Sequence, residues 1–212
     1  MRTFALMIAL GVLSACGGQF QMPDYSAGSL DFGVSTMGVT VEPSLKFNNN
    51  TGARVLIAHG SMDGEQTIDG ITYNADLTVG GVGVLGDYYP GGGNLRLSGG
   101  LLRQNINLDG RATGTAEVGN NTYTGVDLVT NVTPANSVLP MASIGVAHQL
   151  TDRFSLSADL GAIYVGNYSV SATDNTNTIS SADIQNEVQA MEDELNSSPI
   201  VPYIRLGGVL RW

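Results

Sequence analysis

The chain has 212 residues, of which 13% are charged and 28 are glycine, and its formal net charge is −10. This acidic balance argues against a nucleic-acid ligand, because binding a phosphate backbone requires a basic patch. A charged share about half that of typical soluble domains, together with many glycines, favours a β-barrel, in which glycines relieve crowding at bends. The length fits one barrel or one ordinary globular domain.

The first fifteen residues have the pattern of a secretory signal peptide, with one arginine, an apolar run over residues 4–13 and small residues after it. Leu13–Cys16 also resembles a bacterial lipobox, in which Cys16 would be lipidated and become the mature N-terminus. Ordinary cleavage nearby, which discards Cys16, is the alternative. In both cases the protein leaves the cytoplasm, and residues 16–29 are predicted to be a periplasmic lead-in. Since Cys16 is the only cysteine, no intrachain disulfide is expected.

Short segments of alternating apolar and polar residues predict an all-β chain from residue 31 onward. After residue 15, no stretch approaches the roughly 18 apolar residues of a membrane helix. A membrane-embedded chain would therefore cross as a closed barrel, because an open sheet edge cannot face lipid. The eight predicted strands are residues 31–35, 39–47, 54–60, 75–89, 94–107, 137–150, 154–165 and 201–212.

The connections between these strands alternate in length. Short turns near Asn50, Gly92 and Asp152 alternate with long polar loops, which are predicted at residues 64–71, 109–136 and 173–198. Outer-membrane barrels have short periplasmic turns and long extracellular loops. If the final strand ends in the periplasm, every short turn falls on the periplasmic side.

One amphipathic helix is predicted at residues 181–196, in the last extracellular loop. Ile184, Val188, Met191 and Leu195 form a narrow apolar stripe on this otherwise acidic segment. Ser180 and Asp183 resemble a capping box at its start. The helix is interpreted as a lid folded over the barrel mouth, with a partner-binding helix or a membrane-surface segment as alternatives.

The final segment, Val201–Trp212, ends on the only tryptophan. Leu210 and Trp212 fall on one face, and Arg205 and Arg211 fall on the other. A soluble sheet would bury the apolar face, whereas a membrane barrel turns apolar residues to lipid and polar ones to the lumen. The segment resembles the C-terminal targeting strand of outer-membrane β-barrels of Gram-negative bacteria, which ends on Phe or Trp.

Several further stretches support that resemblance. Residues 83–100 read GVLGDYYPGGGNLRLSGG and residues 154–161 read FSLSADLG. With the acidic helix and the closing strand, they resemble the small outer-membrane β-barrel proteins, such as the transmembrane domain of outer-membrane protein A and its eight-stranded relatives. Tyr88 and Tyr89 depart from a similar stretch in a subset of outer-membrane proteins of unassigned role, where Trp and His are usual.

The resemblance implies an antiparallel up-and-down transmembrane β-barrel of about eight strands over residues 30–212. It also implies contact with outer-membrane lipid and lipopolysaccharide, and recognition of Val201–Trp212 by the barrel-assembly machinery. Aromatic residues at strand ends are expected at the membrane interfaces. The candidates are Tyr88, Tyr89, Tyr164 and Trp212.

Charged residues on the strand faces opposite the apolar ones are predicted to line the lumen. An eight-stranded barrel is only wide enough for side chains to fill it, and an unpaired buried charge is very costly. We therefore predict a salt-bridge network that fills the lumen. A narrow anion-preferring conduit lined by Arg96, Arg205 and Arg211 is the alternative. The predicted lumen residues are Glu42, Lys46, Arg54, Asp87, Arg96, Asp159, Arg205 and Arg211.

The sequence offers little support for catalysis, a cofactor or a metal site. His59 and His148 lie on separate predicted strands. Asp63 follows closely after His59, so a catalytic site at the extracellular mouth is kept as a minor alternative. No metal-ligand cluster, phosphate loop or dinucleotide fingerprint is present in the sequence.

We therefore predict a non-enzymatic integral outer-membrane barrel with a structural or surface-interaction role. Two alternatives stay open. One is a narrow channel for small anionic or hydrophobic solutes. The other is a lipid-anchored soluble barrel of lipocalin type, which would bury its apolar faces inside.

Overall fold

The computed structural model of the chain describes residues 27–68, 71–119 and 121–212. The predicted signal peptide, the lipidation candidate Cys16 and most of the predicted lead-in lie outside these residues. The first strand begins at Ala27, slightly before the predicted start of the barrel at residue 30, because Ala27 already pairs with Lys46. Among the described residues, no helix is both long enough and apolar enough to cross a membrane.

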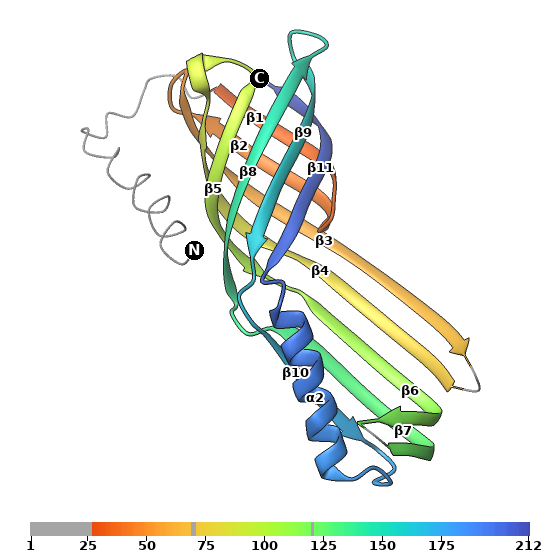
Figure 1. The fold of residues 1–212 in the computed structure, drawn as a ribbon. Helices are drawn as coiled ribbons and strands as arrows, with labels where there is room; N and C mark the ends of the chain where they lie inside the picture. The colour runs from red at the N-terminus through yellow and green to blue at the C-terminus, as the bar shows by residue number, and fades with distance from the viewer. Residues whose placement is uncertain (1–26, 69–70, 120) are drawn as a thin grey trace.

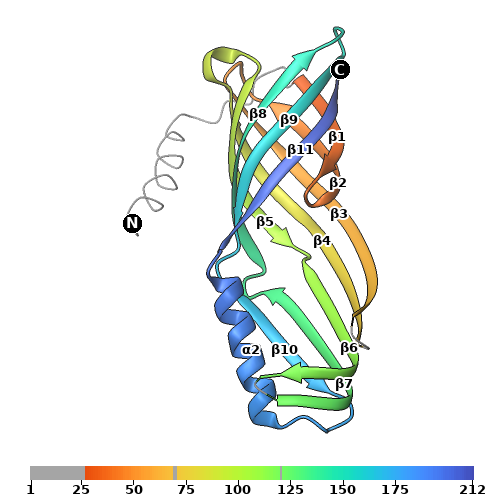
Figure 2. The same ribbon diagram turned by 45° about the vertical axis from the view of Figure 1, so that its right-hand side comes forward.

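Eight of the described strands close into an antiparallel barrel, because the first strand pairs with both the second and the last (Figures 1 and 2). The predicted up-and-down barrel of about eight strands is confirmed. Its strands are β1 (Ala27–Ser35), β2 (Gly38–Lys46), β3 (Thr51–Ile68), β4 (Ile71–Tyr88), β5 (Leu95–Gln104), β8 (Val138–Gln149), β9 (Phe154–Tyr164) and β11 (Ile200–Arg211).

The β2–β3, β4–β5 and β8–β9 turns gather at one end of the barrel, beside the C-terminus. The N–H of Tyr89, next to the 3-10 turn η2 (Pro90–Gly92), donates to the carbonyl of Asn50 in the β2–β3 turn at 2.7 Å. The N–H of Arg211 donates to the carbonyl of Arg153 in the β8–β9 turn at 2.8 Å. The predicted parity therefore holds for these three turns, whereas the tight β1–β2 turn lies at the opposite mouth.

Beyond the opposite mouth, the barrel wall continues as a curved sheet, which we call the extension (Figures 1 and 2). It consists of the distal halves of β3 and β4 with β6 (Asn107–Val118), β7 (Asn121–Pro134) and β10 (Tyr168–Asp174), in the order β3-β4-β6-β7-β10. The helix α2 (Ser181–Asn196) packs on β10. The extension continues only one side of the barrel wall. On the other side, β1 and β2 end at the mouth, where a tight turn at Thr36 and Met37 joins them.

The predicted polar loops at residues 64–71 and 109–136 are wrong, because both regions are mainly strand hairpins of the extension. The reason is a change of polarity along the outward face of each hairpin. Ile57 and Val82, which pair in register, face outward and are exposed, whereas Asp63 and Thr78 occupy outward positions farther along. This polarity switch lies near His59.

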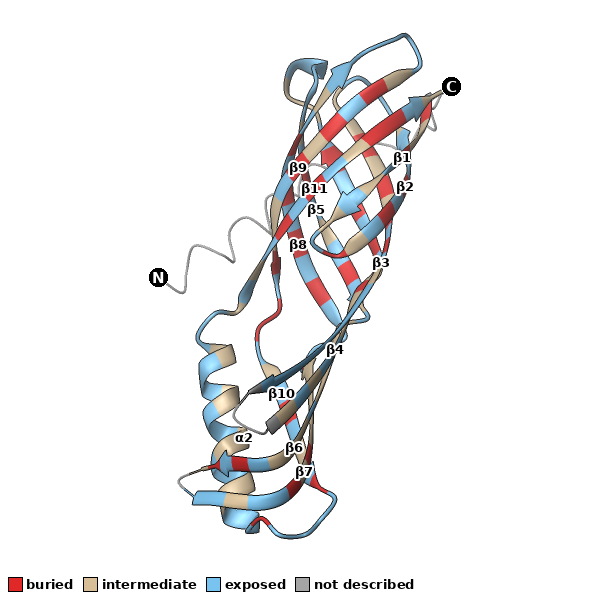
Figure 3. Cartoon of the chain, turned by 90° about the vertical axis from the view of Figure 1, so that its right-hand side faces the viewer, coloured by how far each residue is buried: buried red, intermediate tan, exposed pale blue. Residues whose placement is uncertain are grey.

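Along the barrel strands, buried and exposed residues alternate, as Figure 3 shows. The exposed positions are the apolar ones. Leu206 is 61% exposed and Leu160 is 59% exposed, whereas Arg205 is 1% exposed. Apolar side chains therefore face outward and charged ones inward, which is the polarity of a membrane barrel and the reverse of the lipocalin alternative.

β4 changes its partner at Gly80 and Gly81, pairing with β5 on the barrel side and with β6 in the extension. These glycines have φ angles of 151° and 152°. A Cβ added at Gly80 or Gly81 would lie 2.4 Å from the carbonyl oxygen of Ala58 or Arg103, respectively. Only glycine allows the neighbouring strands to approach this closely at the branch.

Replacing Gly81 by valine is expected to lower the free energy of unfolding by about 2 kcal/mol or more, because it adds both backbone strain and a backbone clash. Urea titration of the refolded protein in detergent measures this change. Gly86→Ala is the matched control on the same strand, since its added Cβ would meet its nearest neighbour only at 3.8 Å. Equal stability of the two variants would contradict the role assigned to this branch.

Candidate functional site

The half of the lumen nearer the short β2–β3, β4–β5 and β8–β9 turns is filled by ionised and hydroxyl side chains. Arg54 is buried, and its Nη1 donates to Glu42 Oε2 at 2.7 Å. Its Nε lies 3.4 Å from Asp87 Oδ1, and its Nη2 donates to Ser98 Oγ at 3.1 Å and to Ser143 Oγ at 3.4 Å. Ser98 Oγ in turn donates to Asp87 Oδ1 at 2.6 Å. One guanidinium thereby links five strands of the barrel.

Arg205, on the final strand, is the second centre of this network. Its Nε lies 2.9 Å from Glu42 Oε1 and its Nη1 lies 3.2 Å from Asp159 Oδ2, while its Nη2 pairs with Asp31. Arg96 reaches the same Asp159, with Nη2 at 2.7 Å and 2.9 Å from the two carboxylate oxygens. Charge-assisted hydrogen bonds of this kind satisfy groups that would otherwise be very costly to bury.

The structure places all eight predicted lumen residues on the inner side of the barrel. Six of them form the network just described, and Lys46 and Arg211 lie at the mouth beside the C-terminus. Asp31 belongs to the network but was missed in the sequence, because the short first strand was not assigned an inner face. Leu30 and Phe32 on either side of it gave the signal, since they place Asp31 on the opposite face.

Nearer the extension, the lumen is closed by apolar side chains, which we call the apolar layer. Leu56, Leu102 and Leu139 have no exposed surface, although they come from three different strands. The Oη of Tyr203 in this layer donates to Glu42 at 3.3 Å and so joins the layer to the network. The lumen therefore contains two successive zones of packed side chains, one charged and one apolar. The layer consists of Met37, Leu56, Ala58, Leu85, Leu102, Leu139, Met141, Ile163, Val165 and Tyr203.

Three of the predicted interface aromatics face outward. Tyr88, Tyr164 and Trp212 are 51%, 53% and 73% exposed, respectively. The prediction is wrong for Tyr89, which turns into the lumen mouth, where the Nζ of Lys46 lies 3.9 Å from its ring centre. Neighbouring strand residues point to opposite faces, so two consecutive tyrosines do not share one girdle.

The two histidines are both exposed and lie near opposite ends of the barrel. His59 pairs in register with Val39 near the extension, and His148 pairs with Leu156 near the short turns. They cannot act on one substrate. Within the described part of the chain, no group of three or more His, Cys, Asp or Glu side chains is arranged to hold a metal ion.

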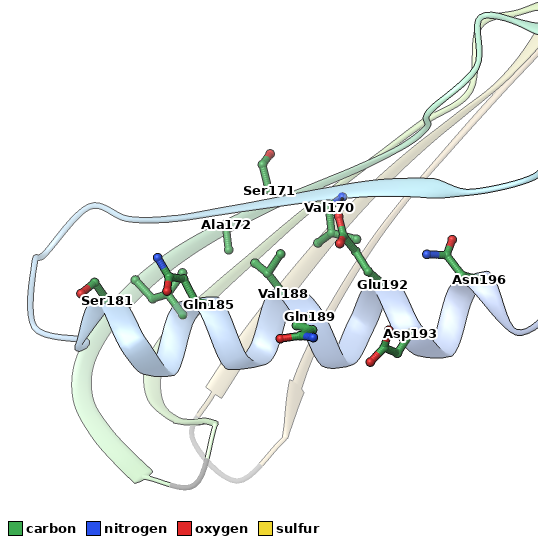
Figure 4. Close-up of a pocket in the computed structure, with 11 residues that line it drawn as sticks. Val170, Ser171, Ala172, Ser181, Gln185, Val188, Gln189, Glu192, Asp193 and Asn196 are labelled. Atoms are coloured by element: carbon green, nitrogen blue, oxygen red, sulfur yellow. Dashed lines mark hydrogen bonds between the residues drawn. The ribbon is translucent and has the colours of Figure 1, made fainter.

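The helix α2 covers the free edge of β10 (Figure 4). Glu192 Oε1 accepts the N–H of Val170 at 3.0 Å, and Asn196 Oδ1 accepts the N–H of Tyr168 at 2.8 Å. Because uncovered edge strands pair with other chains, these acceptors protect β10. The helix bounds match the prediction, but the interpretation as a lid is wrong. The helix lies alongside the extension because its side chains satisfy this edge.

Between α2 and β10 runs a groove of about 670 Å³. Val170, Ala172 and Val188 point toward one another in it, whereas Gln189 and Asp193 lie farther from the strand (Figure 4). At the N-terminus of α2, the Ser180 Oγ accepts the N–H of Asp183 at 3.1 Å, as the capping pattern predicted. The strand residues of the groove lie on the inward face of the extension, since Val170 pairs in register with Val132, and the groove is separate from the barrel lumen.

A hydrogen-bonded loop leads from β10 into α2. Asp174 is buried, and burial acts to raise the pKa of its carboxyl. Hydrogen bonds outweigh that effect and lower this pKa to about 2. They come from the N–H groups of Ile179, Thr176 and Thr178 at 2.9, 2.9 and 2.7 Å, and from the Thr176 hydroxyl at 2.6 Å.

Since its folded pKa lies below the ordinary value of 3.8, the Asp174 carboxylate stabilises the loop at neutral pH. This stabilisation is lost as the pH falls from about 4 to about 2. Asp174→Asn is expected to raise amide hydrogen exchange of residues 176–179 about tenfold or more at pH 7. Asp193→Asn, exposed on α2, is the control and should leave that exchange unchanged. Equal protection in both variants would argue against the loop's dependence on this carboxylate.

The barrel, its polarity and its filled lumen together define the fold of an outer-membrane β-barrel protein. Two solved structures, of Acinetobacter baumannii CarO and CarO2, are similar to this chain. Each superposes with a TM-score of 0.63 at 18% sequence identity. The match covers 89% of this chain and 98% of CarO, and 88% and 98% for CarO2. The sequence matches no protein-family model and no curated protein sequence. These likenesses confirm the predicted fold.

Proposed function

We propose that this chain is a non-enzymatic, non-conducting integral outer-membrane protein. Its barrel would anchor the extension at the cell surface, where the extension has a structural or surface-interaction role. The observation that carries this proposal is the doubly closed lumen. A buried salt-bridge network occupies one half and the apolar layer occupies the other. Hydrocarbon side chains offer ions and water no hydrogen bonds in exchange for hydration.

The barrel exterior supports the membrane location. On β8, outward apolar residues run from Val138 to Val146. This run spans about 27 Å along the strand and roughly 20 Å after a tilt of about 40°. The apolar belt of outer-membrane barrels is of similar height, about 25 Å. A soluble monomer rarely exposes an apolar patch of more than a few hundred Å².

The outer face of the extension supports a role in water. Asp63, Asp76 and Asp109 lie directly opposite one another across β3, β4 and β6. Like charges in register repel one another, and they are tolerated where water screens them. Arg111 on the same face pairs with Asp127 at 2.7 Å and is half-exposed. The extension therefore presents a polar, mainly acidic surface on a rigid stalk.

Planar-bilayer recording tests the closed lumen. The wild-type protein and the Arg96→Ala, Arg205→Ala double variant are both expected to give no conductance steps above background, because the apolar layer remains in place. Heat-modifiable gel migration verifies that each barrel is folded, and a general porin serves as the positive control. Steady ion conductance of the wild-type protein would sink the proposal and support the channel alternative.

Surface labelling tests the orientation. A cysteine introduced at Ser61, in the extension, is expected to react with a membrane-impermeant maleimide on intact cells. A cysteine at Thr151, in the β8–β9 turn, should react only after the outer membrane is opened. The parent chain is the control for Cys16. The reverse labelling pattern would invert the proposed topology.

A further inference from the structure

The lumen retains a small cavity of about 60 Å³ at the mouth beside the short turns. In the proposed topology this mouth faces the periplasm. The cavity lies below the salt-bridge network and is reached from water, because its lining combines network residues with residues of the turns. The polar part of that lining includes Ser29, Ser44, Lys46, Asn94, Arg96 and Arg211, together with the network carboxylates Asp31 and Glu42.

Positive charge exceeds negative charge in this half of the lumen. Five cations, Arg54, Arg96, Arg205, Lys46 and Arg211, meet four carboxylates, Asp31, Glu42, Asp87 and Asp159. Among the described residues, neither Lys46 nor Arg211 has a carboxylate oxygen within 4.0 Å. This excess is local, because the whole chain carries a net charge of −10.

The contacts that Lys46 and Arg211 do make are neutral. The Lys46 ammonium lies over the Tyr89 ring, and Arg211 Nη1 donates to Ser155 Oγ at 2.6 Å. Arg96 pairs with Asp159, but its buried Nε has no hydrogen-bond partner within the described structure. Lys46 and Arg211 therefore keep donors available at the cavity, which Arg96 also lines. A half-buried charge that lacks a counter-ion is costly, so the site favours an added anion.

We propose that the periplasmic mouth binds one small water-borne oxyanion, a carboxylate or a phosphate group, between Lys46, Arg96 and Arg211. Guanidinium groups match both oxyanions in shape and in hydrogen-bond geometry. The Ser29 and Ser44 hydroxyls, which hydrogen-bond to each other at 2.6 Å, line the same cavity. The cavity is small, about 60 Å³, which suits one such group.

Isothermal titration of the refolded full chain in detergent, with inorganic phosphate and separately with acetate, tests this site. Saturable binding of at least one anion is expected, and the responding anion identifies the group that the site accepts. The affinity should fall at least tenfold in the Lys46→Gln, Arg211→Gln double variant. Lys46→Gln alone, at the edge of the mouth, gives a second measurement that does not alter the final strand.

Arg103→Gln is the matched control, because Arg103 is exposed at the other end of β5 and should leave the affinity unchanged. Absence of saturable binding of both anions, or equal binding by the wild type and the double variant, would overturn the proposal. The closed lumen stands or falls separately, by conductance.

Discussion

Replacing Arg205 by alanine is expected to lower the free energy of unfolding by about 3–5 kcal/mol, the cost of breaking a buried ion pair by removing one partner. Arg205 is 1% exposed and pairs with Asp31, Glu42 and Asp159. The substitution leaves these three carboxylates buried without the guanidinium with which they all pair. Urea titration in detergent, followed by the fluorescence of the only tryptophan, Trp212, measures the change.

Arg103→Ala removes an exposed guanidinium and is the control, with an expected change within about 0.5 kcal/mol. Adding Asp31→Asn and Glu42→Gln to Arg205→Ala should recover part of the lost stability, because fewer unpaired charges then stay buried. A loss below about 1 kcal/mol for Arg205→Ala would mean that water, rather than the network, solvates these carboxylates.

Replacing Leu206 by arginine is expected to destabilise the barrel in lipid bilayers by about 2–4 kcal/mol, the cost of a cation near the bilayer midplane. Leu206 faces outward in the middle of β11, where it pairs in register with Val34 and Ala158. Denaturant titration of the protein in lipid vesicles measures this cost.

The matched control is Ser61→Arg, which adds the same side chain to the outward face beyond the polarity switch. Its expected cost is about 0–1 kcal/mol, as found near membrane interfaces. A larger loss of stability for Leu206→Arg than for Ser61→Arg is the result expected if hydrocarbon surrounds the barrel. If Leu206→Arg and Ser61→Arg cost the same, the outward face of β11 meets water and the membrane placement is wrong.

Elements with a local pattern could be predicted from the sequence. The helix bounds, residues 181–196, follow from the apolar stripe and the Ser180 cap, both of which are properties of neighbouring residues. Within the barrel, alternation placed the charged residues of β2, β3 and β9 on the inner face. The parity of the connections then gave the orientation of the strands.

The extension could not be predicted, because its strands obey the opposite rule of polarity. In water, the outward face of β6 and β7 is polar, and the inward face carries small residues such as Gly110 and Ala112 beside Leu108 and Val132. The segment therefore reads as a polar loop. Only the pairing of these strands with the long β3–β4 hairpin makes them a sheet.

The apolar layer was missed for a different reason. On β3, inward Leu56 and Ala58 alternate with outward Val55 and Ile57, so both faces are apolar and the period of two disappears. On β3, the sequence therefore identifies the inner face only at Arg54, where the charged half of the lumen begins. Whether an inward leucine touches lipid, solute or another leucine depends on strands that are distant in the chain.

The seam between β1 and β11 also bears on how the protein reaches its native state. The ion pair across it joins Asp31 to Arg205, which are 174 positions apart. Contacts of such long range form late, because a large loop must first be closed. The edges of β1 and β11 therefore stay unpaired until the barrel closes, and a truncated copy that lacks β11 is expected to aggregate rather than to form a smaller barrel.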